Sequence, residues 1–228
     1  GNLVIHSSEF QGLKGRELCA HLLSRLEAAT WEAPFPLQVE VWERNVVSSP
    51  SLQVWIPLSG PPLLEGVFDQ SLAEEVGRFQ GASVSSLGGE LLERLSEQAS
   101  RLACFLQNLG YYGRCSLDSV VTENGQIYWI ECNGRWGGTS IPMTVLNRLG
   151  IDWNRDKAAI VCSHVHRAPC DFAEVLKKTG DLSWKDRRGV VWLSPTRTEA
   201  GEGLDFLAVA DSSQKVDELT RGVHRRLE

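Results

Sequence analysis

Apolar residues recur at helical spacing along several segments of the chain. Over residues 9–28 and 91–109 they stand three and four positions apart, which predicts two amphipathic helices. Ser7 or Ser8 is placed to cap the first helix, and Gly110 to end the second. Further helices are predicted near residues 145–149, 156–162, 171–179 and 212–227.

Runs rich in β-branched and aromatic residues predict the strands. These runs cover residues 3–5, 37–42, 49–60, 61–72, 115–121, 126–132, 189–193 and 204–210. A turn at Ser59–Pro62 divides two of them, and residues 79–89 are predicted to form a loop. The chain is therefore expected to mix helices and strands.

The most informative stretch is RCSLDSVVTENGQIYWIECNGRWGGTSIP, residues 114–142. Asn124-Gly125 predicts a two-residue type I′ turn between two strands. Counting outward from that turn pairs Glu123 with Gln126, Val121 with Tyr128, Ser119 with Ile130, and Asp118 with Glu131. Because side chains alternate along a strand, Glu131 and Asn133 share a face and Cys132 points the other way.

Two carboxylates facing each other across a hairpin destabilise it unless a cation lies between them. Asp118, Glu131 and Asn133 offer the hard oxygen ligands that Mg²⁺ takes when nucleotide phosphates complete its shell. The alternative is a polar hairpin face in water, in the same or another register, whose acids bind no metal.

The residues after the hairpin are suited to an anion. Arg135 carries a planar guanidinium that binds anions through two prongs. Gly137, Gly138, Thr139 and Ser140 follow it, and paired glycines let backbone N–H groups approach an anionic ligand closely. The same glycines are equally compatible with a plain turn.

This stretch resembles the C-terminal half of the ATP-grasp ligases. The likeness lies in the order of its features: an acid on one strand, a short turn, Glu-x-Asn on the next strand, an arginine and a glycine-rich loop. The ECNGR stretch at residues 131–135 is most similar to the peptide ligases of the pheganomycin type. The resemblance extends from about Leu37 to the C-terminus. It implies an α/β (α+β) fold with a largely antiparallel sheet backed by helices. Residues 37–150 would form the ATP-grasp C-terminal lobe with the metal and nucleotide site, and residues 151–228 a small C-terminal α/β appendage.

The resemblance also implies an activity. These ligases transfer the γ-phosphate of ATP to a carboxylate, and an amine then attacks the acyl phosphate to form a peptide or amide bond. It implies ATP and Mg²⁺, or Mn²⁺, as cofactors, with Asp118 and Glu131 holding one ion and Glu131 and Asn133 the other. Arg135 would hold the acyl phosphate or the substrate carboxylate, beside the backbone of residues 137–140. Some relatives carry an arginine where this chain has Ser116.

In the same family an acid at the end of a strand that joins the two lobes contacts the ribose. Glu40 and Glu43 both fall where that acid is expected, and the choice between them stays open. Each is equally compatible with an acid on the solvent face of an edge strand.

The N-terminal residues resemble the end of a lobe. Gly1-Asn2 is similar to the last part of the flexible loop that covers the nucleotide phosphates, so residues 1–36 would be a remnant of the loop-bearing lobe. The phosphate-contacting lysine of the family is not found there. We therefore expect the isolated chain to bind ATP poorly and to be inactive until the N-terminal part of the enzyme is supplied. Two alternatives are a non-catalytic nucleotide-binding or docking module and a phosphate-transferring synthase that forms no amide.

Composition restricts the partners. With 228 residues, a net charge of −6 and a pI near 5.5, no nucleic-acid partner is expected, and no stretch is apolar enough to span a membrane. Six cysteines without CxxC spacing predict reduced, buried thiols in a cytoplasmic protein. His164 and His166, near Cys162 and Cys170, are interpreted as surface groups rather than a metal site. The expected partners are small-molecule or peptide carboxylates and amines, and a homo-oligomer is left open.

Overall fold

The computed structural model describes residue 5 and residues 7–31, 40–72, 79–151, 159–167, 172–198 and 201–227. The chain divides into two compact units, one of residues 1–44 with 73–78 and one of residues 45–72 with 79–228. Each unit is described by itself. The boundaries predicted at residues 36 and 150 stay a prediction.

The first unit contains a short 3-10 helix, η1 (Ser7–Phe10), and the helix α1 (Gly15–Ala28). The prediction of one helix from residue 9 with a serine cap was wrong, because α1 begins after Lys14. The Leu13 N–H closes a turn onto the Phe10 carbonyl at 3.0 Å, and Gly12 has a φ of +85° that no helix adopts.

The strands predicted at residues 3–5 and 37–42 belong largely to the part that the structure does not describe. Gly1-Asn2, residues 3 and 4, and residues 37–39 lie outside the described ranges. Ile5 and residues 40–42 are described and have no regular structure.

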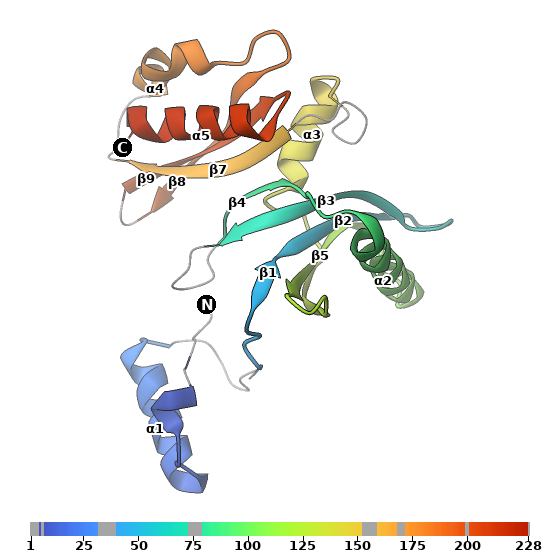
Figure 1. Ribbon diagram of the computed structural model, residues 1–228, viewed down its shortest axis with the longest axis vertical. Coiled ribbons are helices and arrows are strands. Elements are labelled where there is room, and N and C mark those ends of the chain that lie inside the picture. The colour runs from blue at the N-terminus through green and yellow to red at the C-terminus, as the bar shows by residue number, and fades with distance from the viewer. Residues whose placement is uncertain are drawn as a thin grey trace. The chain divides into compact units, whose positions relative to one another are not determined.

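In the described residues of the second unit, nine strands form one sheet (Figure 1). The strands are β1 (Val46–Ser48), β2 (Pro50–Ile56), β3 (Leu63–Leu72), β4 (Phe79–Val84), β5 (Gly113–Thr122), β6 (Ile127–Asn133), β7 (Ala159–Arg167), β8 (Gly189–Thr198) and β9 (Gly201–Ala210). They follow the order β1-β5-β2-β3-β4-β7-β9-β8, and β6 also pairs with β5. Every pair is antiparallel, as predicted for the sheet.

Helix α2 (Gly89–Asn108) backs the part of the sheet that contains the hairpin, as the apolar stripe predicted. Leu95, Ala99 and Ala103 are fully buried against alternate residues of β2 and β5. The residues between those alternate positions, including Gln53 and Asp118, therefore lie on the other face of the sheet.

That other face is covered in part by helix α3 (Ser140–Arg148). Met143 and Leu146 of α3 form one buried cluster with Phe68 of β3, Ala82 of β4 and Leu207 of β9. The cluster ties the glycine-rich loop, which runs directly into α3, to the centre of the sheet.

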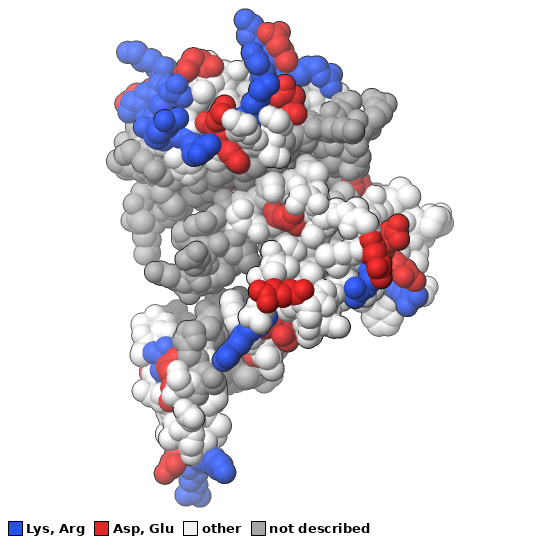
Figure 2. Space-filling view, viewed as in Figure 1, with Lys and Arg blue, Asp and Glu red and all other residues white. Residues whose placement is uncertain are grey.

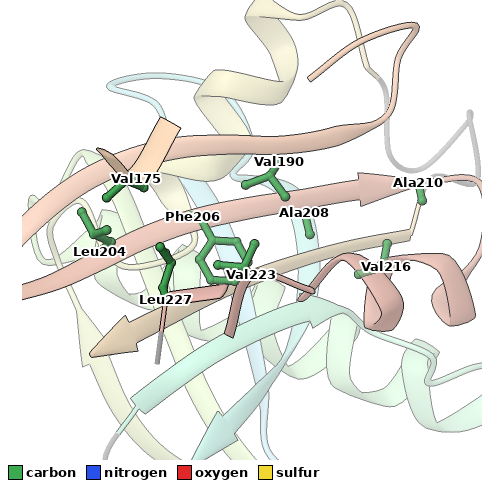
Figure 3. Close-up of a cluster of buried hydrophobic side chains, with 9 residues drawn as sticks. All are labelled: Val175, Val190, Leu204, Phe206, Ala208, Ala210, Val216, Val223 and Leu227. Atoms are coloured by element: carbon green, nitrogen blue, oxygen red, sulfur yellow. The ribbon is translucent and has the colours of Figure 1, made fainter. Parts of the chain in front are cut away.

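The C-terminal segment adds β7, β8 and β9 to the same sheet and carries α4 (Phe172–Thr179), η2 (Gly180–Leu182) and α5 (Ser213–Leu227). Figure 3 shows the core between these helices and the strands, with Phe206 facing Val223. Its members come from α4, β8, β9 and α5: Val175, Val190, Leu204, Phe206, Ala208, Ala210, Val216, Val223 and Leu227.

Most of the remaining predicted elements are confirmed, including strands β2, β3, β8 and β9 and the helices α3, α4 and α5. The Lys215 N–H donates to the Ser212 hydroxyl at 3.4 Å, in line with the predicted cap of α5. Two predictions were wrong. Residues 79–84 form β4 rather than a loop, and residues 159–162 belong to β7 rather than a helix. Both strands form because each meets a free backbone edge of the sheet, and this pairing outweighs local propensity.

The cysteine prediction holds only in part. Among the cysteines whose side chains are described, Cys115 is buried, Cys19, Cys104 and Cys132 are exposed, and all four are free thiols. Cys170 lies outside the described residues, as do the side chains of Cys162, His164 and His166.

The surface carries both signs of charge, and Figure 2 shows Lys and Arg side chains mixed with Asp and Glu over α4 and α5. In the described part of the chain, no helix is both long and apolar enough to cross a membrane.

Candidate metal and nucleotide site

The hairpin of β5 and β6 pairs Asp118 directly with Glu131, as predicted. It does so by a different turn. Glu123, Asn124 and Gly125 form a three-residue loop closed between Thr122 and Gln126, and only Gly125 has a positive φ, +76°. The loop brings Val121 opposite Ile127 and Ser119 opposite Trp129, one residue from the predicted partners Tyr128 and Ile130.

A β-bulge then restores the predicted register. Ile130 is the extra residue of β6 between the pairs Ser119–Trp129 and Asp118–Glu131. One residue added in the turn is offset by one residue left unpaired in the strand. Leu117 therefore faces Cys132, Ser116 faces Asn133, and the three candidate ligands stay in their predicted places.

Asp118 lies on the face opposite α2, among neutral hydrogen-bond donors. The Ser51 hydroxyl donates to its Oδ1 at 2.6 Å, and the Asn133 Nδ2 donates to its Oδ2 at 3.2 Å. Gln70 of β3 also hydrogen-bonds to the carboxylate. Burial raises the pKa of the Asp118 carboxyl, the Glu131 carboxylate raises it further, and the hydrogen bonds from Ser51, Gln70 and Asn133 lower it.

The donor set fits a divalent cation. Asp118 and Glu131 stand opposite each other, and the hydrogen-bond partners found for Asp118 in the described residues are all neutral. The repulsion that raises the pKa of Asp118 is removed when a cation binds both carboxylates. Asn133 lies beside them with its Nδ2 on Asp118 and its Oδ1 accepting from Arg135, so its amide would have to turn to offer the oxygen to a metal. Within the described ranges no group of three His, Cys, Asp or Glu side chains is placed to hold a metal, and Asn133 as a third ligand stays a prediction.

Arg135 is exposed and hydrogen-bonds within the site. Its Nη2 donates to the Asn133 Oδ1 at 3.2 Å, and its Nη1 donates to the Trp136 carbonyl at 3.3 Å. The guanidinium is therefore linked to the candidate metal ligands through Asn133. A Cβ added to Gly137 would lie 3.8 Å from the Arg135 Nη1, so the glycine-rich loop passes beside this guanidinium.

The ring of Phe79 packs against the glycine-rich loop. A Cβ added to Gly138 would lie 3.0 Å from the Phe79 ring, so any larger residue there would have to displace that ring slightly. Thr139 and Ser140 are buried, and the Ser140 hydroxyl accepts the Gly137 N–H at 3.2 Å. Gly137 and Gly138 are less buried than Thr139 and Ser140. The ligand contacts predicted for these four residues stay predictions.

Sequence reasoning missed three polar residues of this face: Ser51 and Gln53 of β2, and Gln70 of β3. Ser51 and Gln53 are buried, at 3% and 0% exposure. Their signal was the alternation of β2, where polar Ser51 and Gln53 interleave with apolar Leu52 and Val54.

Arg114 occupies the same face four residues before Asp118. It forms a two-pronged ion pair with Glu65, and its guanidinium lies 5.0 Å from the centre of the Trp136 ring. Ser116, where some relatives carry an arginine, is buried between Arg114 and Asp118 on the strand. Arg114 is thus committed to an internal pair.

Glu40 and Glu43 belong to the first unit, whereas the hairpin belongs to the second. The contact of either acid with the ribose stays a prediction.

No family model and no curated protein matches the sequence. Solved structures are similar in fold. N5-carboxyaminoimidazole ribonucleotide synthetase from Thermus thermophilus is 14% identical with a TM-score of 0.58, over 80% of this chain and 51% of that chain. N5-carboxyaminoimidazole synthase from Aspergillus clavatus, in complex with ADP and 5-aminoimidazole ribonucleotide, is 11% identical with a TM-score of 0.58, over 89% of this chain and 57% of that chain.

Biotin carboxylase from Campylobacter jejuni is 14% identical with a TM-score of 0.54, over 83% of this chain and 47% of that chain. The chain spans about half the length of these proteins. At these identities the likeness shows the fold, and the similarity to pheganomycin-type ligases stays a prediction. The chain has the mixed α/β fold of the ATP-grasp enzymes, with a largely antiparallel sheet.

Proposed function

We propose that this chain carries the metal and nucleotide site of an ATP-dependent carboxylate–amine ligase, which forms a peptide or amide bond through an acyl phosphate. The observation that supports the proposal best is the pairing of Asp118 with Glu131 on one sheet face, with Asn133 and Arg135 beside them, in an ATP-grasp fold. Two carboxylates that face each other, one of them half-buried, repel each other without a cation, so their pairing favours a bound metal.

Asp118 and Glu131 would hold one Mg²⁺ or Mn²⁺ ion, and Glu131 and Asn133 a second. Ions held by these residues would supply positive charge to the phosphate oxygens of ATP. The chain's own residues prepare the ligands: Ser51 and Asn133 each donate to one oxygen of Asp118 and so fix the plane of its carboxylate. Little reorientation of this ligand is then needed when the metal arrives.

Arg135 would bind the substrate carboxylate or the acyl phosphate. It is exposed, is linked to the candidate ligands through Asn133, and runs beside the Gly137 backbone. The guanidinium and the backbone of residues 137–140 would together hold the anion while an amine approaches.

The remaining assignments rest on the likeness in fold. Glu40 or Glu43 would contact the ribose, and the substrates would be small-molecule or peptide carboxylates and amines. The Aspergillus clavatus relative binds ADP, which supports a nucleotide as the ligand here.

The test is Mn²⁺ binding in the presence of millimolar ATP, followed by electron paramagnetic resonance. Glu131→Gln removes the carboxylate shared by both ions, and we expect it to weaken Mn²⁺ binding at least about tenfold and, once the N-terminal part of the enzyme is supplied, to abolish ATP turnover. Glu123→Gln, at the exposed hairpin turn, changes charge equally and should leave binding unchanged. Near-normal Mn²⁺ binding by Glu131→Gln would refute the site. Mn²⁺·ATP binding without turnover, with the N-terminal part of the enzyme, carboxylates and amines all supplied, would favour the non-catalytic module.

A further inference from the structure

A buried chain of hydrogen bonds joins the glycine-rich loop to Asp118. The Gly137 N–H donates to the Ser140 Oγ at 3.2 Å, and the Ser140 hydroxyl donates to the Gln53 Oε1 at 3.2 Å. The Gln53 Nε2 donates to the Ser51 Oγ at 3.1 Å, and the Ser51 hydroxyl donates to the Asp118 Oδ1 at 2.6 Å. Gln53 is the centre of the chain and contacts neither end.

The carboxylate sets the direction of every bond in the chain. Ser51 has one hydroxyl proton, which it donates in a hydrogen bond to Asp118. Toward Gln53, Ser51 can therefore only accept a hydrogen bond. The amide of Gln53 must then turn its nitrogen to Ser51 and its oxygen to Ser140. Ser140 in turn donates to Gln53 and accepts from Gly137, so each group has one orientation.

Burial makes these orientations hard to replace. Gln53 is 0%, Ser140 1% and Ser51 3% exposed, so bulk water has no direct access to substitute for a lost partner. The same strand packs Leu52 and Val54 into an apolar cluster on its other face. Replacing a whole buried polar network by well-packed apolar side chains is often neutral for stability, so stability alone does not account for these polar groups.

We propose that Gln53 is a positioning residue that holds the Asp118 carboxylate and the Gly137–Ser140 loop in one fixed geometry. This inference deepens the proposed function, because it concerns the same site. A reaction between a metal-bound phosphate and an anion held by the loop depends on the distance between the two, and errors near 1 Å lower rates by roughly a hundredfold. Gln53 keeps that distance constant from within the sheet.

The test uses nuclear magnetic resonance of the 228-residue chain, with one reporter at each end. The reporters are the Gly137 backbone amide and the Asn133 side-chain amide, which donates to Asp118. Ser140→Ala should shift the Asn133 signal and Ser51→Ala the Gly137 signal, although neither changed residue contacts that reporter. Gln53→Met should shift both.

Gln98→Met is the matched control. Gln98 accepts the Trp129 Nε1–H at 2.8 Å on the α2 side of the same hairpin, so the variant removes a comparable hydrogen bond on the opposite face. It should leave both reporters in place. If Ser140→Ala leaves Asn133 unmoved and Ser51→Ala leaves Gly137 unmoved in folded protein, the bonds are independent and the proposal is wrong. This result does not require Gln53→Met to fold.

A second measurement separates this proposal from the proposed function. In the presence of millimolar ATP, Ser140→Ala should weaken Mn²⁺ binding several-fold, by roughly the value of one hydrogen bond, although Ser140 is not a proposed metal ligand and the variant keeps its backbone. If the unchanged protein binds no Mn²⁺, the proposed function fails, while the two reporters still decide whether Gln53 couples the loop to Asp118. If it binds Mn²⁺ and Ser140→Ala has no effect, the positioning role is refuted.

Discussion

Asp118 is the residue whose surroundings depart most from those of an ordinary surface acid. Its carboxyl is partly buried, faces Glu131, and has a raised pKa for these two reasons. A raised pKa in the folded state means that the folded protein binds the proton more tightly than the unfolded chain does.

The first prediction concerns pH and stability without divalent metal. The contribution of Asp118 is fully present below its unfolded pKa of about 4 and is lost as pH rises through its higher folded pKa. Relative to Asp118→Asn, the unchanged protein should therefore lose free energy of unfolding over that window, measured by urea unfolding in a chelator.

Asp211 is the control of opposite sign, since a hydrogen bond from Lys215 lowers its pKa. Asp211→Asn should therefore lower the free energy of unfolding slightly more at higher pH than at lower pH. A flat difference for Asp118→Asn would contradict the raised pKa.

The second prediction is that Arg135 serves the ligand rather than the fold. Arg135→Lys keeps the charge but loses the two-pronged geometry. Since charge-assisted hydrogen bonds contribute about 1.5–3 kcal/mol, turnover measured with the N-terminal part of the enzyme supplied should fall roughly 10- to 100-fold. Because Arg135 is exposed, the melting temperature should hardly change. Arg101→Lys, in an exposed ion pair with Glu97, is the matched control for both measurements. A large loss of melting temperature with unchanged turnover per folded molecule would indicate a structural ion pair instead.

At the scale of the element, the hairpin combines a turn and a bulge that depend on each other. The three-residue turn displaces β6 by one residue, and the bulge at Ile130 returns Glu131 to Asp118. The turn needs Gly125 at a φ of +76°, where side chains with a Cβ are strained.

The third prediction tests that turn. Gly125→Ala should lower the free energy of unfolding by about 1 kcal/mol, and Gly125→Asn by less, because asparagine tolerates a positive φ. An added Cβ would meet nothing closer than the Arg94 Nη1 at 4.0 Å, so the cost is conformational rather than a clash. Gly180→Ala, where a Cβ also meets nothing within 4 Å and φ is not positive, is the control. Equal effects of the two alanines in urea unfolding would argue against the three-residue turn.

At the scale of the whole second unit, β9 links two cores. Leu207 and Val209 belong to the cluster with α3, whereas Phe206 and Ala208 belong to the cluster with α5. Strand β7 also pairs with β4, so residues 201–210 are joined to the sheet that carries Asp118.

The fourth prediction is that this unit unfolds cooperatively. Leu207→Ala should cost about 2–5 kcal/mol and should accelerate hydrogen exchange of the β5 amides as much as that of the β9 amides. Leu109→Ala, at a side chain that is 69% exposed, should change neither. Faster exchange confined to β7–β9, with β5 unaffected, would show that the C-terminal segment is an independent appendage.

Helical periodicity and hairpin chemistry were readable from the sequence. The apolar stripe of α2 and the strands β2, β3, β5 and β6 follow from local patterns, because burying one face imposes a period of 3.6 or 2. The pairing of Asp118 with Glu131 was also predicted, although the turn was not. A turn one residue longer and one bulge offset each other, and local sequence does not show a bulge whose purpose is to restore register.

What the sequence determined by itself is the set of chemical groups: two carboxylates and an amide on one hairpin, followed by an arginine and a glycine-rich loop. Tertiary structure alone decided what surrounds them. Strand pairing turned residues 79–84 and 159–167 into β4 and β7, because a free sheet edge satisfies backbone groups that local propensity leaves undetermined. The folded structure also placed Gln53 between Ser51 and Ser140. Gln53 and Ser140 are 87 positions apart in the sequence. A hydrogen bond between residues that distant leaves no periodic trace in the sequence, since only the folded sheet brings its two partners together.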